Sequence, residues 1–122
     1  MTGLYLVAAE LSKRKLIVSP TSRSAQTADL LVTDANCQRA YAVQVKTNAS
    51  IFSFWLMNSK TKTIKSDFLV YAFVNLRKNG TEFYLVPSCV VADNVKSSDN
   101  STWWAIELKD IADFKDNWGL FE

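Results

Sequence analysis

Two apolar segments that carry polar side chains constrain this chain more than any other feature of its sequence. Residues 28–33 and 40–47 each predict a strand, and the Asp-Ala-Asn turn between them predicts a hairpin. Gln44 and Lys46 are two positions apart, so their side chains point to the same face of the sheet. If the two strands pair across the turn, Asp29 faces the same place. A carboxylate, an amide oxygen and an ammonium at one sheet edge suit a divalent cation beside a phosphate.

The composition is that of one globular domain. The chain has 122 residues, of which 48% are apolar and 21% are charged, and we expect residues 1–122 to form a single domain with an aromatic tail from about residue 103. No apolar run approaches the roughly 20 residues of a membrane span, and the N-terminus lacks the pattern of a signal peptide. We therefore expect an intracellular, cytoplasmic protein without a membrane partner, in which Cys37 and Cys89 are reduced thiols.

Histidine is absent from the sequence, and this absence excludes several kinds of chemistry. It removes Ser-His-Asp and Cys-His catalysis, most catalytic zinc sites and nucleases that use a histidine base. Any hydrolysis must then use carboxylates, lysine and a hard metal ion. The net charge of +2 permits nucleic-acid binding but does not argue for it.

The N-terminal segment reads as a helix over residues 3–15, with Thr2 as its N-cap. Its apolar stripe consists of Leu4, Val7, Ala8 and Leu11. Glu10 lies about 60° from Val7 around the helix and about 100° from Leu11, so it flanks the apolar face. We expect it to sit at the edge of the packed sheet.

The rest of the chain predicts further strands, one more helix and a tail. The expected strands are residues 16–19, 51–57, 68–76 and 82–86, the helix is 88–95, and a short aromatic helical tail covers 103–121. The apolar run 68–76 is typical of a strand buried on both faces, and Asn79-Gly80 predicts a hairpin after it. We therefore expect an α/β fold with a mixed central β-sheet of about five strands flanked by helices.

The ordered set of Glu10 on a helix, Asp29 on a strand and then Gln44-Val45-Lys46 resembles the PD-(D/E)xK nuclease superfamily. It is most similar to small members with a Q-x-K third motif, such as Mrr-like restriction domains and some homing endonucleases. The resemblance covers roughly residues 3–95 and implies a restriction-endonuclease-like fold. The chain departs from the family pattern at Gln44, where the usual residue is an acid, and at Ala28, where proline is usual.

The resemblance implies a role for each residue of the set. Asp29, Gln44 and Glu10 would hold Mg²⁺, with Mn²⁺ as a substitute. Lys46 would orient or deprotonate the attacking water and stabilise the pentavalent phosphate. The function implied is a metal-dependent DNA endonuclease.

We expect DNA to contact Arg23 and Ser22 in the polar loop, and Thr47 at the end of the second strand. The protein would act as a homodimer, because one compact active site cuts one strand at a time. Two alternatives remain open. The first is a catalytically inactive protein of the same fold, an inhibitor, an immunity-type protein or a DNA-binding protein, that engages a partner through the aromatic tail. The second is a nuclease selective for branched DNA.

Overall fold

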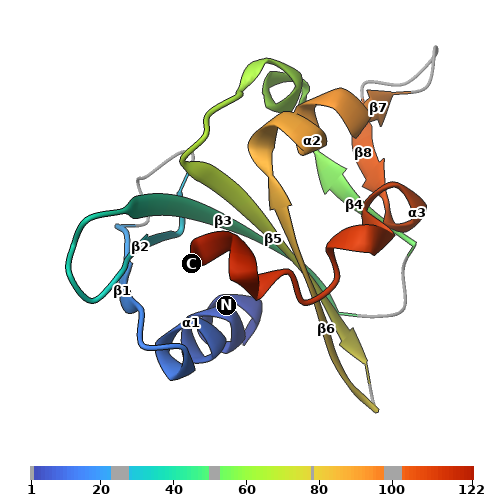
Figure 1. The fold of residues 1–122 in the computed structure, drawn as a ribbon. Coiled ribbons are helices and arrows are strands. Elements are labelled where there is room, and N and C mark those ends of the chain that lie inside the picture. Colours follow the sequence, from blue (N-terminus) through green and yellow to red (C-terminus); the bar gives the residue numbers. More distant parts are fainter. Residues whose placement is uncertain (1, 23–27, 50–52, 78, 98–102) are drawn as a thin grey trace.

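One mixed sheet and a second, smaller sheet organise the chain (Figure 1). The computed structural model describes residues 2–22, 28–49, 53–77, 79–97 and 103–122. In chain order the elements are α1 (Thr2–Lys13), β1 (Ile17–Pro20), β2 (Leu30–Thr33), β3 (Ala40–Asn48), β4 (Phe54–Met57), η1 (Ser59–Thr63), β5 (Leu69–Arg77), β6 (Gly80–Pro87), α2 (Ser88–Asn94), β7 (Lys96–Ser97), β8 (Trp104–Glu107), α3 (Leu108–Ile111), η2 (Ala112–Phe114) and η3 (Trp118–Phe121).

The central sheet has the strand order β1-β2-β3-β5-β6. β3 and β5 run parallel, and the other neighbouring pairs are antiparallel. A parallel pair needs a crossover, and the segment with β4 and η1 provides it. The middle position of β5 explains its sequence: all residues from Leu69 to Asn75 are buried, because both faces of this strand are covered.

Strand alternation sorts the core into two clusters on opposite faces of the central sheet. On the first face, α1 and η3 pack Val7, Leu11 and Phe121 against β3, β5 and β6, and these residues belong to the first core. On the second face, β4, β8, α2 and α3 pack against the same sheet, and Trp55 and Ile106 are buried between them in the second core. In Figure 1, α1 and the C-terminal η3 lie to the lower left of the central strands, and α2 with the smaller sheet lies to their upper right.

Within the described residues, the second core covers the second face over β5, β6 and Ala42 of β3. Leu31 lies opposite Ala42, and Ile17 lies opposite Thr33, so both side chains point to this face. They are 52% and 50% exposed, respectively. The β1–β2 half of the second face is therefore open to solvent, and it adjoins the β3 positions that carry Gln44 and Lys46.

The predicted five-stranded mixed sheet with flanking helices is confirmed. The predicted strand near 51–57 forms β4, but it belongs to the smaller sheet, and residues 50–52 lie outside the described ranges. The helical tail predicted over 103–121 was wrong at its start, where residues 104–107 form β8. This strand exists because it pairs with β4 and β7, which are distant in sequence. The two cysteines are free and exposed.

No described helix has the length and apolar character needed to cross a lipid bilayer.

Candidate functional site

The backbone and the side chain of Asp29 are both fixed to the neighbouring strands. Its N–H donates to the Val43 carbonyl at 2.8 Å, and its carbonyl accepts from the Thr21 N–H at 3.0 Å. Its carboxylate oxygen Oδ2 accepts a hydrogen bond from the backbone N–H of Val45 at 2.7 Å. Val45 is the residue between Gln44 and Lys46. The structure thus places the Asp29 carboxylate beside β3, at the stretch that carries the other two polar side chains.

Gln44 and Lys46 share the second face of the central sheet, opposite to α1. In the parallel register of β3 and β5, Gln44 lies beside Tyr71 and Lys46 beside Phe73, and both rings belong to the second core. Both polar side chains are half-buried. Among the described residues, no hydrogen bond or ion pair to the Gln44 amide or the Lys46 ammonium is found. The structure therefore brings the Asp29 carboxylate to the stretch of β3 that carries Gln44 and Lys46, and the convergence of the three side chains into one site stays a prediction.

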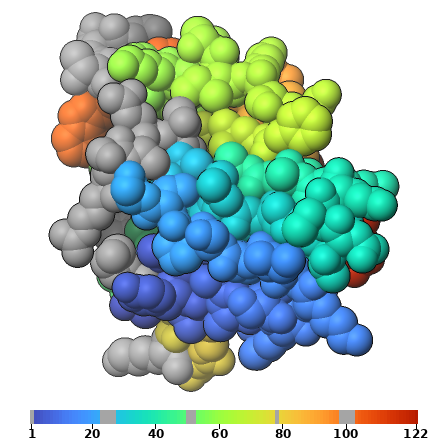
Figure 2. All heavy atoms as spheres, turned by 90° about the vertical axis from the view of Figure 1, so that its left-hand side faces the viewer, coloured from blue at the N-terminus to red at the C-terminus, as the bar shows by residue number. Residues whose placement is uncertain are grey.

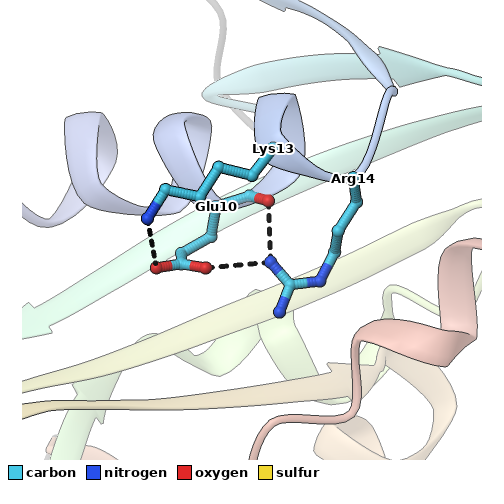
Figure 3. A network of polar contacts seen from close by, with 3 residues as sticks. All are labelled: Glu10, Lys13 and Arg14. Atoms are coloured by element: carbon cyan, nitrogen blue, oxygen red, sulfur yellow. Dashed lines mark hydrogen bonds and ion pairs between the residues drawn. The ribbon is translucent and has the colours of Figure 1, made fainter.

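Glu10 occupies a different environment. Its carboxylate accepts from Arg14 Nη1 at 2.9 Å and lies 3.5 Å from Lys13 Nζ, and Figure 3 shows it between these two side chains. The hydrogen bond from Arg14, aided by Lys13, lowers the pKa of Glu10 below its ordinary value. The Arg14 guanidinium in turn stacks over the Trp118 ring, 4.4 Å from its centroid. The structure joins Glu10 to Lys13 at the end of α1 and to Arg14 directly after it, and its carboxylate has no contact with Asp29 among the described residues.

The site offers few donor atoms for a divalent cation. Asp29 offers one carboxylate and Gln44 one amide oxygen, and within the described ranges no group of three His, Cys, Asp or Glu residues is placed to hold a metal ion. Mg²⁺ in proteins keeps several waters and is often bound through one or two carboxylates together with substrate phosphates. The donor set therefore fits a hydrated cation that is held weakly until a phosphate joins it.

The residues expected to contact nucleic acid are not all on one side of the sheet. Ser22 is exposed and follows Thr21, whose backbone is bonded to Asp29, so it lies at the margin of the site. Arg23 lies outside the described residues. Thr47 is on the α1 face, where its side chain is in contact with Gly3. It is therefore on the opposite side of the sheet from Lys46.

Thr21 is a supporting residue that sequence reasoning missed. Besides its backbone bond to Asp29, its hydroxyl donates to the Ala28 carbonyl at 2.6 Å. The two bonds join the end of β1 to the residues before β2 and hold Asp29 in place. Its position directly after the strand-ending Pro20 was the only signal in the sequence, and a threonine in a polar loop is too common to be chosen from that alone.

No protein-family model matches the chain, and no curated protein is detectably similar to it in sequence. Among solved structures it is similar to Hjc, a Holliday junction resolvase from the archaeal hyperthermophile Archaeoglobus fulgidus, with a TM-score of 0.58 and 10% identity. The similarity covers 88% of this chain and 90% of the resolvase. At this identity the match shows a common fold. The chain has a restriction-endonuclease-like α/β fold, as its sequence predicts.

Proposed function

We propose that this protein is a metal-dependent endonuclease that hydrolyses phosphodiester bonds in DNA. The observation that carries the proposal is the Asp29 carboxylate, held by the Val45 N–H between Gln44 and Lys46 on the open part of the sheet. The fold shared with a Holliday junction resolvase supports it. The absence of histidine fits as well, because this chemistry needs none.

The reaction would add water across a P–O bond. Asp29 and the Gln44 amide oxygen would hold Mg²⁺ or Mn²⁺, which when bound neutralises charge on the phosphate and makes water a better nucleophile. Lys46 would orient the attacking water and stabilise the negative charge that grows on the non-bridging oxygens. As the new P–O bond forms, the bond to the leaving oxygen breaks, and that oxygen takes up a proton from solvent. Glu10 would contribute only if its carboxylate left Arg14, so we assign it no step.

DNA would lie on the open half of the second face, with Ser22 at its margin. A contact with Arg23, which lies outside the described residues, stays a prediction. One site cuts one strand, so cleavage of both strands would require a homodimer. The oligomeric state is measured by light scattering coupled to size-exclusion chromatography. A four-way junction cut in preference to linear duplex would identify a branched-DNA substrate.

A second function is favoured because few groups at the site can hold a metal ion. Gln44 is neutral, and the Glu10 carboxylate is engaged by Arg14, which leaves Asp29 as the one carboxylate at the described site. Such a chain could bind DNA or a protein without cutting. Of the tail aromatics, Trp118 and Phe121 are buried in the first core, whereas Trp103 is 67% exposed at the surface that a protein partner could reach. The inactive binding protein remains the alternative.

The test is cleavage of supercoiled plasmid and of a four-way junction in Mg²⁺ and Mn²⁺. We compare the wild type with Asp29→Asn and Lys46→Ala, and with Lys109→Ala as the control, because Lys109 is an exposed lysine paired with Glu107 at 3.0 Å. The proposal expects a loss of at least about 100-fold in the first two variants and none in the control. Titration with Mn²⁺ followed by electron paramagnetic resonance should show weaker binding in Asp29→Asn. A folded wild type that cuts neither substrate, or equal cleavage by all variants, contradicts the proposal.

A further inference from the structure

The short helix η1 lies above the strand that neighbours Gln44. Gln44 is beside Tyr71 in the β3–β5 register. Ile64, the residue directly after η1, packs against the second core, to which Tyr71 belongs and against which Ala42 of β3 also packs. Thr61 is the middle residue of η1 and is itself only 4% exposed. These contacts place η1 on the second face of the sheet, the face that carries Gln44 and Lys46.

The residues on either side of Thr61 are exposed lysines. Lys60 and Lys62 point away from the core while Thr61 points into it. We call these two residues the η1 lysines. Figure 2 shows the segment around η1, in lime green, near the top of the molecule, with β1 to β3 in blue to teal below it and α1 in dark blue below these strands.

The η1 lysines differ from most other lysines of the protein in having no acidic partner. Ion pairs engage Lys13, Lys65, Lys96, Lys109 and Lys115. The lysines without one, within the part of the chain that is described, are Lys15, Lys46, Lys60 and Lys62. Three of these four belong to the site or to η1. Within the described residues, unpaired lysines thus gather on the face of the sheet that carries the candidate site.

The segment that carries the η1 lysines is held in place at both ends. At its start, the Asn58 side chain accepts from the Thr61 N–H at 3.2 Å and caps η1. Beyond its end, the Ser88 hydroxyl accepts from the Ser66 N–H at 2.8 Å and donates to the Ser66 carbonyl at 2.7 Å. A ligand would therefore meet a preformed ridge and would not have to order a loop, which lowers the cost of binding.

We propose that Lys60 and Lys62 bind the sugar–phosphate backbone of the nucleic acid that the Asp29–Gln44–Lys46 set acts on. The inference rests on the proposed function and adds the surface that holds the substrate. Two ammonium groups on a rigid ridge each neutralise a phosphate and release its condensed counterion, without reading the base sequence. Asp67 lies in the same connection, and it forms an ion pair with neither lysine. The flanking strand of the substrate would then run from η1 across Gln44 toward Asp29.

The experiment measures the affinity of a fluorescent 20-base-pair duplex and of a four-way junction by anisotropy between 50 and 200 mM KCl, with EDTA present to prevent cleavage. The variant is Lys60→Ala/Lys62→Ala. The control is Lys109→Ala/Lys115→Ala, which removes the same net charge from two lysines that are paired with Glu107 and Glu82. Thermal unfolding checks that both variants are folded.

We expect the η1 variant to bind roughly 10- to 60-fold more weakly at 0.1 M salt, with a log–log salt slope smaller by about 2, since each phosphate contact contributes about 0.9. The control should keep the wild-type slope. An η1 variant with wild-type affinity and slope, or an equal loss in the control, overturns the inference. A wild type that does not bind either probe overturns it as well.

The outcomes separate this inference from the proposed function. If the wild type cuts DNA and the η1 variant binds normally, the surface is wrong and the nuclease stands. If the salt slope of the η1 variant falls by the expected amount but the wild type cuts nothing in Mg²⁺ or Mn²⁺, the DNA-binding surface is supported and the catalytic proposal fails.

Discussion

Replacing Asp29 separates its structural role from its chemical role. Asp29→Ala removes the acceptor of the Val45 N–H bond at 2.7 Å. A hydrogen bond to a charged group contributes about 1.5–3 kcal/mol, and the half-buried position of both residues favours the lower end, about 1.5–2 kcal/mol. With an unfolding entropy of about 2.1 cal/mol/K per residue, this corresponds to a fall in Tm of about 6–8 °C for 122 residues. Asp29→Asn keeps an oxygen that can accept the same bond, so most of this stability should remain.

The assay combines thermal unfolding by circular dichroism with plasmid cleavage. We expect Asp29→Asn to melt within about 3 °C of the wild type and to lose cleavage, whereas Asp29→Ala loses both stability and cleavage. An Asp29→Ala protein that melts with the wild type would show that the Val45 bond does not hold the carboxylate. An Asp29→Asn protein that cuts as well as the wild type would show that the carboxylate charge is not needed.

Three further changes test the packing and charge of the fold. Gly3→Ala places a Cβ against the Thr47 side chain, whose Cβ and Cγ2 would lie 3.0 and 3.1 Å from the added atom. We therefore expect the free energy of unfolding, measured in urea, to fall by about 1–3 kcal/mol. Adding Thr47→Ala should restore most of this stability, and the absence of any rescue would contradict the contact. Glu10→Gln should cost about 0.3–1 kcal/mol at pH 7. Because the Arg14 hydrogen bond lowers the pKa of Glu10, this stabilisation is fully present above the ordinary value of 4.5 and is lost as the pH falls through the lowered pKa. A difference in Tm between the two proteins that does not shrink as the pH is taken further below 4.5 would refute the ion pair. Asn75 is fully buried, and neither side-chain polar atom has a partner in the described structure, so Asn75→Leu should raise the unfolding free energy by about 1–3 kcal/mol, and a lowered urea midpoint would argue against this.

Local sequence patterns predicted a large part of the fold. The apolar run at 68–76 predicted a strand covered on both faces, and β5 is buried through Asn75. The Asn-Gly pair after it predicted the β5–β6 hairpin, in which Gly80 has a φ of 138° that other residues rarely adopt. The period-two placement of Gln44 and Lys46 was enough to predict that they share a face, because strand alternation is a local property.

Patterns of the same kind failed where partners distant in the chain decide the structure. The Trp-Trp-Ala-Ile segment is compatible with a helix or a strand, and its pairing with β4 makes it a strand. The helix position of Glu10 was read correctly as flanking the apolar stripe, but the sequence does not say which neighbours lie there. Arg14, which directly follows the end of α1 and stacks on Trp118, donates a hydrogen bond to the Glu10 carboxylate.

The sequence by itself determined most of the element types, the mixed sheet and which face Gln44 and Lys46 share, because each depends on periodicity and on residues close in the chain. Only the tertiary structure decided that residues 104–107 form a strand, that the Asp29 carboxylate is bonded to the Val45 N–H, that Glu10 is held by Arg14, and that the segment after η1 packs with Tyr71 in the second core. These facts depend on how the crossover, α1 and the sheet pack together. Such packing joins segments that no local pattern relates.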